Sequence, residues 1–361
     1  MALQILKCLS DVNVNFEIWV NSKNHIFVKK YSDLGLDLDT IKEIDIYSRG
    51  FALRVLPCNI IDLFTFAFKY LTSNKFDNVL YVDGEVFSSG FAPLVTKLFG
   101  CVNIIYCPLL PRLKLRNLLF NTILKTFFSI SVVINELQLT YWGSFMPGRV
   151  LLIQNFINNT DNANNSVEVD ELNAKLKDAI GDVLLSNRKN ILIPGRIQFS
   201  QKKQDELIGL LAASEFLIDN FNFVFVGDGP DFNYLSKIIS AKKINSKIKC
   251  FLIEWSDCLF ADKIFKYWSA VLLNSDYEGE PVVFLKALQK GIPCLAPNNL
   301  VSENLVSSKL TFKRRDVDSL VSVLNNILLN EGSLCIIEQK YYIASRRNSS
   351  IEGQWIKLLT A

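Results

Sequence analysis

The stretch Ala270-Val-Leu-Leu-Asn-Ser-Asp-Tyr-Glu-Gly-Glu-Pro-Val-Val-Phe-Leu-Lys-Ala-Leu-Gln-Lys-Gly-Ile-Pro-Cys-Leu-Ala296 decides the fold of this chain. Its apolar beginning, up to Leu273, predicts a buried strand, and a turn of small and acidic residues follows. Pro281 then begins a helix that ends at Gly291, because proline favours the first turn of a helix and glycine the position just past its end. A strand, turn and helix in this order aim the free N–H groups of the helix start at whatever lies above the sheet. The stretch therefore predicts an anion site.

The same alternation of short apolar segments and longer amphipathic ones runs along the whole chain. It predicts an α/β fold in which parallel sheets are wound with helices. In the first half we predict strands at 16–20, 78–82, 102–106, 131–134 and 150–155, and helices at 57–72, 88–99 and 112–128. In the second half we predict strands that begin near 190 and 223, strands at 248–254, 270–274 and 292–296, and a helix at 202–216.

A polar segment without periodicity, residues 158–166, interrupts this pattern, and a helix of mixed charge follows it. A length of 361 residues is enough for two hydrophobic cores. We therefore predict an N-terminal domain at 1–157, a linker at 158–189, a C-terminal domain at 190–345 and a closing helix at 346–361.

Composition narrows the class of protein. Half of the residues are hydrophobic, 21% are charged and the net charge is +3, which is typical of a globular protein and not of a dedicated nucleic-acid binder. The eight cysteines have neither metal-ligand nor redox spacing, so we expect small buried hydrophobic residues in a reducing cytosol. No apolar run reaches the roughly 18–20 residues of a membrane span. The sequence predicts a cytoplasmic protein.

The opening stretch resembles the signature S-x-x-E-G-x-P-x-x-x-x-E-A-x-x-x-G-x-P-V of the retaining GT-B glycosyltransferases of family 4, the glycosyl transferases group 1. The matching residues are Ser275, Glu278, Gly279, Pro281, Ala287, Gly291 and Pro293. The resemblance implies two doubly wound Rossmann-like domains that face a cleft, with a C-terminal helix returning to the first domain. It also implies transfer of a sugar, with retention, from a nucleotide-sugar to a glycan or lipid-linked acceptor. The implied pathway is the biosynthesis of a surface polysaccharide such as lipopolysaccharide.

Two basic residues stand where relatives clamp the diphosphate of the sugar donor. Arg196 follows a strand and Lys202 lies at the opening of a helix. Negative charge develops on the departing phosphate, and fixed cations in a dry site stabilise it. The alternative is a solvated basic start of a helix, and Lys203 is a second candidate for the lysine.

Glu278 corresponds to a carboxylate that contacts hydroxyls of the transferred sugar in the family, and an exposed turn acid is the alternative. Gly279 and Glu280 would offer backbone N–H groups to the diphosphate beside Pro281. The other residues that the resemblance assigns to donor binding lie at strand ends: Gly195, Gly227, Glu254 and Glu303. A strand-to-helix turn that needs glycine is the alternative for Gly227, and a buried indole of Trp255 is the alternative for the Glu254-Trp255 pair.

Two features depart from the family pattern. Lys286 stands where the family has a second glutamate that accepts hydrogen bonds from the ribose, and an ammonium group cannot accept them. Residues 2–9 resemble the helix that follows the first strand and Gly-Gly loop of the family. The strand and loop themselves have no counterpart in this chain, which predicts a truncated N-terminus. Both departures favour the alternative of a catalytically degenerate GT-B protein that acts as a binding or partner subunit.

On the acceptor side we predict Asp83 and Glu85, which follow a strand, with helix-capping turn acids as the alternative. The resemblance implies that neither a metal nor another cofactor is needed. Residues 109–128 mix basic with large apolar side chains and predict peripheral contact with the inner face of the cytoplasmic membrane. A core helix with basic ends is the alternative for this segment.

Overall fold

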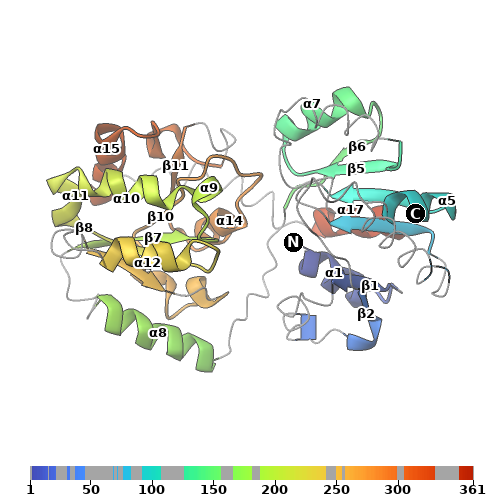
Figure 1. The fold of residues 1–361 in the computed structure, drawn as a ribbon, viewed down its shortest axis with the longest axis horizontal. Coiled ribbons are helices and arrows are strands. Elements are labelled where there is room, and N and C mark those ends of the chain that lie inside the picture. The colour runs from blue at the N-terminus through green and yellow to red at the C-terminus, as the bar shows by residue number, and fades with distance from the viewer. Residues whose placement is uncertain are drawn as a thin grey trace. The chain divides into compact units, whose positions relative to one another are not determined.

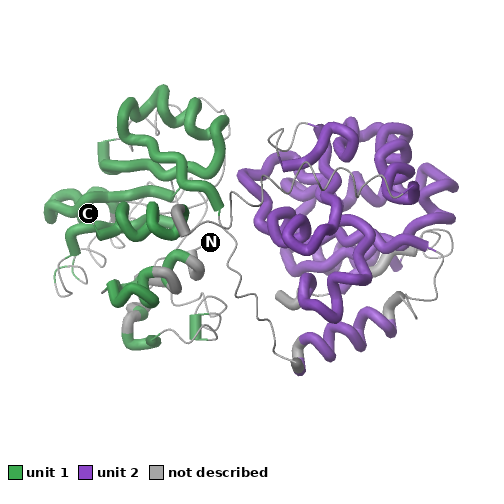
Figure 2. The backbone as a smooth tube through the Cα atoms, turned by 180° about the vertical axis from the view of Figure 1, so that it is seen from behind, with its two compact units in different colours: residues 1–156, 348–361 green, residues 157–347 purple. Residues whose placement is uncertain are grey.

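The chain consists of two compact units, residues 1–156 with 348–361 and residues 157–347 (Figure 2). Both contain a parallel sheet with helices, so the predicted α/β class is confirmed (Figure 1). The computed structural model describes residues 2–14, 16–21, 31–32, 37–44, 68, 71, 76–82, 92–106, 126–155, 166–180, 188–240, 249–253, 257–298, 305–329 and 349–360.

The second unit is built on six parallel strands in the order β12-β11-β10-β7-β8-β9. The strands are β7 (Lys189–Pro194), β8 (Phe221–Val226), β9 (Lys249–Ile253), β10 (Ala270–Leu272), β11 (Cys294–Pro297) and β12 (Thr311–Phe312). The chain runs outward from β7 to β9 and then returns to the other side of β7, where it continues from β10 to β12. This is the Rossmann order, and its direction reverses between β7 and β10.

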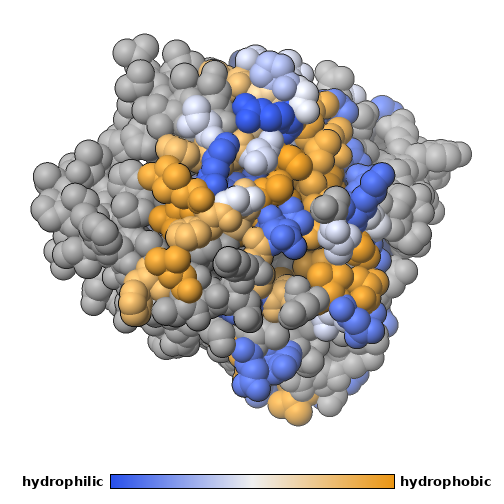
Figure 3. Space-filling model, turned by 90° about the vertical axis from the view of Figure 1, so that its right-hand side faces the viewer, coloured by the Kyte–Doolittle hydropathy of each residue, from blue (hydrophilic) through white to orange (hydrophobic). Residues whose placement is uncertain are grey.

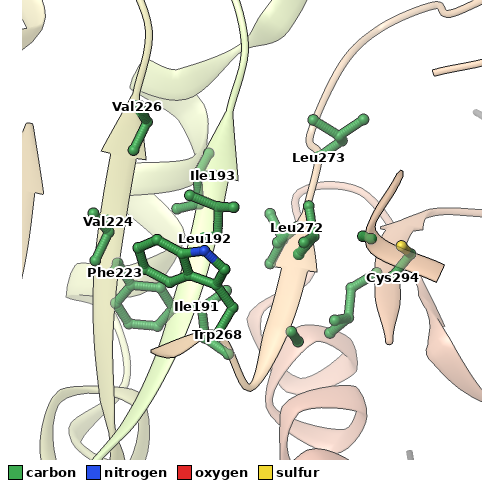
Figure 4. Packing of buried hydrophobic residues seen from close by; sticks show 14 of the residues in the cluster. Ile191, Leu192, Ile193, Phe223, Val224, Val226, Trp268, Leu272, Leu273 and Cys294 are labelled. Atoms are coloured by element: carbon green, nitrogen blue, oxygen red, sulfur yellow. The ribbon is translucent and has the colours of Figure 1, made fainter. Parts of the chain in front are cut away.

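The strands of this sheet are buried because helices cover both faces. All six residues of β8, Phe-Asn-Phe-Val-Phe-Val, are buried, which explains why its sequence is apolar without alternation. Figure 4 shows side chains of β7, β8, β10 and β11 packed together, Cys294 among them. Burial raises the pKa of the Cys294 thiol well above its ordinary value, so this cysteine stays protonated and packs as a small hydrophobic residue.

Helices connect the strands of the second unit. They are α8 (Ser166–Ile180), α9 (Phe199–Lys202), α10 (Gln204–Ala212), α11 (Glu215–Asn220), α12 (Phe232–Ser240), α14 (Val282–Gln289) and α15 (Val317–Leu328), with short 3-10 helices at η2 (Asp257–Phe260), η3 (Phe265–Tyr267) and η4 (Ser308–Leu310). Crossovers between parallel strands are right-handed, so the reversal at β7 places the helices of the two halves on opposite faces.

The prediction of one helix at 202–216 is wrong. Lys203 adopts a left-handed conformation with φ of 52° and separates α9 from α10. Ser214 begins the next helix, since its hydroxyl accepts a hydrogen bond from the backbone N–H of Leu217 at 3.4 Å. Both breaks depend on a local backbone conformation that apolar periodicity does not report.

The first unit holds a parallel sheet in the order β3-β4-β5-β6 and a separate parallel pair, β1-β2. The strands are β1 (Ile18–Asn21), β2 (Ile41–Ile44), β3 (Asn78–Val82), β4 (Val102–Tyr106), β5 (Ile130–Val133) and β6 (Val150–Leu152). In the described part of this unit the helical elements are α1 (Ala2–Asp11), η1 (Leu38–Thr40), α5 (Ala92–Leu98), α7 (Glu136–Phe145) and α17 (Ser349–Thr360). Strands β2 and β12 have only four and two residues and were not predicted from the sequence.

The C-terminal helix α17 packs into the core of the first unit, as the resemblance implies. Ile351 and Trp355 are buried beside Ile5 and Leu9 of α1. The ring of Trp355 meets that of Tyr106 edge to face, with 5.6 Å between the centroids. These contacts join the end of the chain to its beginning and to the β4 strand of the sheet.

The surface mixes apolar with polar side chains, and Figure 3 shows both kinds next to one another on one face. Among the described residues, exposed apolar side chains include Phe68, Leu98 and Leu137. In the part of the chain that the structure describes, no helix combines the length and the apolar character that a bilayer crossing requires.

Candidate functional site

Gly195, Lys202 and Glu278 lie together where β7 and β10 end. The two strands are parallel neighbours, with Ala270 opposite Ile191 and Val271 opposite Leu192. Their carboxyl ends therefore open at one edge of the sheet, beside the point where the strand order reverses. Ligands of open α/β sheets bind in the crevice at such a switch point.

The loops after β7 and β8 contact each other through their backbones. The N–H of Gly195 donates to the carbonyl of Val226 at 2.9 Å, and the N–H of Ile197 donates to the carbonyl of Asp228 at 2.9 Å. A Cβ atom on Gly227 would lie 1.8 Å from the carbonyl oxygen of Gly195. Gly227 is therefore required for this contact, and the β8 loop determines where the β7 loop can lie.

We expect Gly227→Ala to destabilise the second unit by about 3 kcal/mol or more, because a methyl group there collides with backbone that cannot rotate away. Gly209→Ala is the matched control, since Gly209 lies in α10 with open space at its Cβ position. This control should gain up to about 1 kcal/mol from helix propensity. Unfolding midpoints in urea measure both changes, and an unchanged midpoint for Gly227→Ala would contradict the close packing of the loops.

The short helix α9 brings Lys202 to the ends of the two strands. Its first residue, Phe199, donates its backbone N–H to the carboxylate of Asp231 at 2.7 Å, and the carbonyl of Gln198 accepts from the N–H of Lys202 at 2.7 Å. The left-handed Lys203 then ends the helix. Asp231, which the sequence analysis missed, follows the Gly-Asp-Gly-Pro turn and supports α9 from the neighbouring loop.

Lys202 meets the turn that follows β10. Its ammonium forms an ion pair with the carboxylate of Glu278, and the hydroxyl of Ser275 donates to the same carboxylate oxygen at 2.6 Å. The lysine side chain lies over Gly195, because Cε of Lys202 is 3.9 Å from the position that a Cβ atom on Gly195 would take. Because the side chains of Lys202 and Glu278 are only 18% and 10% exposed, the pair is largely removed from water.

Arg196 has a different environment, because it is exposed. Its backbone is anchored, since its carbonyl accepts a hydrogen bond from the side chain of Gln204 at 2.9 Å. Among the described residues, none forms a hydrogen bond or an ion pair with the guanidinium of Arg196. An anion that enters at the end of β7 therefore meets one cation without a charged partner and a second cation, Lys202, that is paired to Glu278.

The turn after β10 leads into α14 as predicted, although the helix itself begins one residue later. Pro281 is the N-cap with φ of −67°, and its carbonyl accepts from the N–H of Phe284 at 2.9 Å. Gly279 is half-buried and Glu280 is buried in the preceding turn. Gly291, with φ of 76°, follows the helix end as the sequence indicated.

Lys286 lies on α14 and is half-buried. The buried side of this helix consists of Phe284, Leu285, Ala287 and Leu288. Lys286 is thus absent from the apolar side of α14, and its relation to a ribose stays a prediction.

Several predicted residues lie outside the described part of the chain. These are Asp83, Glu85, Glu254 and Glu303, together with 109–125 of the predicted membrane-contact segment. Among the described residues, no group of three or more His, Cys, Asp or Glu side chains is arranged to hold a metal ion.

The matches to known proteins agree with this geometry. Residues 179–347, which hold every described residue of the site, match the family described as glycosyl transferases group 1. A lipopolysaccharide 1,6-galactosyltransferase of Escherichia coli (strain K12) is 26% identical over 144 residues. This alignment spans 38% of the present chain and only 39% of that enzyme.

Two solved structures resemble the whole chain. The apo form of the lipopolysaccharide outer core galactosyltransferase WaaB is similar with a TM-score of 0.62 and 15% identity, covering 99% of this chain and 93% of that one. The Anabaena protein Alr3699/HepE in complex with UDP and glucose is similar with a TM-score of 0.74 and 14% identity, covering 99% of this chain and 95% of that one.

Identities this low establish the fold alone, and the family match concerns residues 179–347, slightly less than half of the chain. Residues 179–347 therefore match the glycosyl transferases group 1 family, and the chain as a whole has the GT-B fold.

Proposed function

We propose that the protein transfers a hexose from a UDP-sugar to a saccharide or lipid-linked acceptor, with retention of configuration, in the synthesis of a surface polysaccharide such as lipopolysaccharide. One observation carries the proposal: Arg196, Lys202 and Glu278 all lie at the ends of β7 and β10, within the segment that matches the family. The choice of UDP is supported by HepE, whose solved complex contains UDP and glucose.

In this proposal each charged residue has a distinct task. Arg196 and Lys202 bind the diphosphate and counter the negative charge that it gains as the bond to the sugar breaks. Glu278 accepts hydrogen bonds from sugar hydroxyls and so orients the sugar ring. The acceptor hydroxyl attacks from the face that the diphosphate leaves, so no nucleophile of the enzyme is used and no metal or other cofactor takes part.

Lys202 and Glu278 form an ion pair, so a donor that binds to Lys202 has to separate the two side chains. A diphosphate that reaches Lys202 competes with the carboxylate of Glu278 for the same ammonium. Once displaced, Glu278 remains within reach of Ser275, whose hydroxyl holds it at 2.6 Å. The released carboxylate is then free to accept a hydrogen bond from the sugar.

Calorimetric titration with UDP, UDP-glucose and UDP-galactose tests the proposal, with ADP and GDP as comparisons. We expect the wild type to bind UDP and at least one UDP-sugar. It should also hydrolyse that UDP-sugar slowly and so release UDP, with water in place of the acceptor. Arg196→Ala should bind UDP about tenfold more weakly, because one charge-assisted contact is lost. If none of the five nucleotides binds, the proposed function is wrong.

A binding subunit without transferase activity is the second candidate, because Lys286 stands at the place of the family's second glutamate. The same titration separates the two functions. Binding of a UDP-sugar with no release of UDP, either in water or with saccharide acceptors, would favour the binding subunit.

A further inference from the structure

A second set of charges lies beside the Lys202–Glu278 pair, and we name it the charge cluster: Lys203, Glu206, Asp276, Arg314 and Arg315. The Lys203 ammonium lies 3.3 Å from the Asp276 carboxylate and 3.7 Å from that of Glu206. Arg314 contacts Asp276 and lies 3.1 Å from Glu206, while Arg315 lies 3.0 Å from Glu206. The charge cluster thus joins three segments: the junction of α9 with α10, the turn after β10, and the loop between β12 and α15.

Arg314 is central to the charge cluster because it pairs with both Asp276 and Glu206, as Lys203 does, and also links them to the loop between β12 and α15. Its side chain is 17% exposed, whereas that of Arg315 is 73% exposed. The hydrogen bond from Arg315, together with the charges of Arg314 and Arg315, holds the pKa of Glu206 below its ordinary value. Glu206 therefore remains ionised at neutral pH and keeps its pairing with Arg314.

Backbone strain coincides with the charge cluster. In the described part of the chain, three residues other than glycine have a positive φ, and two of them are Lys203 at 52° and Arg315 at 60°. The left-handed conformation costs such residues about 1–2 kcal/mol each, and strain of this kind persists where surrounding contacts compensate for it. The Nε atom of Arg314 is buried without a hydrogen-bond partner among the described residues. The cluster is thus not arranged for maximal stability, which favours a functional reason for it.

The charge cluster and the proposed donor site share one turn. Asp276 follows Ser275 directly and precedes Glu278 by two residues. The same turn is tied to α9 by its backbone, since the N–H of Asp276 donates to the carbonyl of Gln201 at 2.7 Å. A displacement of Asp276 would therefore move Glu278 away from Lys202, and a shift of about 1 Å in a catalytic group can cost up to about 100-fold in rate.

We propose that Arg314 is a positioning residue for donor binding, which holds Asp276 and Glu206 together and thereby keeps the Ser275–Glu278 turn against α10, directly after the helix α9 that carries Lys202. The proposal rests on the proposed function for its consequence, the affinity for a UDP-sugar. Its structural part, the fixing of the turn, is independent of any ligand.

A double-mutant cycle tests the consequence. Arg314→Gln and Asp276→Asn should each weaken UDP binding in calorimetry by about tenfold, and the double variant should bind no more weakly than the poorer single variant. Arg314→Lys should recover part of the affinity, because an ammonium can still pair with Asp276. Lys263→Gln is the control, since it removes an exposed ion pair with Asp170 elsewhere in the unit and should leave UDP binding unchanged.

Two outcomes of the cycle would overturn the proposal. If the losses of the two single variants add in the double variant, Arg314 contacts the nucleotide itself and does not act through Asp276. If Arg314→Gln binds UDP as the wild type does, the cluster does not position the site.

Hydrogen exchange in the ligand-free protein tests the structural part. The amides of 275–280 should exchange about tenfold faster in Arg314→Gln than in the wild type, with an intermediate rate in Arg314→Lys. Thermal unfolding shows whether each variant is folded. If Arg314→Gln does not fold, the exchange of 275–280 is measured in Arg314→Lys instead. Failure of the wild type to bind UDP would contradict only the proposed function, whereas unchanged exchange in folded Arg314 variants would contradict only the positioning role.

Discussion

Lys202→Met is expected to lower the release of UDP from a UDP-sugar by about 100- to 1,000-fold. The ammonium of Lys202 lies beside Gly195, at the switch point, and its side chain is mostly shielded from water. A fixed charge in such a place stabilises developing negative charge much more than an exposed one does. Methionine keeps most of the length and the apolar stem, so the change removes the charge with little loss of packing.

Lys203→Met is the matched control for this experiment. The two lysines are adjacent, but Lys203 points to Glu206 and Asp276 of the charge cluster. Its loss should lower the rate by no more than about tenfold, through the position of the turn alone. If Lys202→Met and Lys203→Met lower the rate of UDP release equally, Lys202 has no special role in the reaction.

Glu278→Gln should change two measurements in opposite directions. We expect UDP to bind about tenfold more tightly, because the carboxylate that competes for Lys202 is gone and a like charge no longer faces the diphosphate. We expect the release of UDP from a UDP-sugar to fall about 100-fold, because the amide holds the sugar hydroxyls less strongly than a carboxylate. Calorimetry and an assay of UDP release on the same samples give both values.

Whether Glu278→Gln raises or lowers the affinity for UDP decides what the ion pair with Lys202 does. If Glu278→Gln weakens UDP binding as Lys202→Met does, the ion pair serves to orient Lys202 and does not compete with the nucleotide. Ser275→Ala is a suitable companion variant, since it removes the hydroxyl that donates to Glu278 and leaves the charge in place. Ser275→Ala should lower the rate of UDP release by about tenfold or less.

Much of the fold could be predicted from the sequence, because the strands of both parallel sheets consist mostly of apolar residues. The predicted strands at 78–82 and 102–106 coincide with β3 and β4, and the helix that Pro281 and Gly291 delimit is α14. Such features depend on neighbours in the chain, as does the family signature around Glu278. Local patterns of this kind survive in the sequence whatever the distant contacts are.

The rest of the site could not be predicted because it depends on contacts between residues far apart in the chain. Lys202 and Glu278 are 76 residues apart, and Arg314 and Glu206 are 108 residues apart. No periodicity relates such positions, and the short β12 strand that precedes Arg314 has too few residues to be recognised. The broken helix at Lys203 was missed for a related reason, since contacts from the turn after β10 support its left-handed backbone.

The sequence by itself determined the α/β class, the alternation of strands and helices, and the residues of the family signature, because burial and helix termini depend on neighbouring residues. Only the tertiary structure decided which charges meet. It pairs Lys202 with Glu278, leaves the exposed Arg196 without a charged partner among the described residues, and joins Asp276 to Arg314. The physical reason is that strand order is set by packing of whole elements, and strand order alone brings the ends of β7 and β10 together.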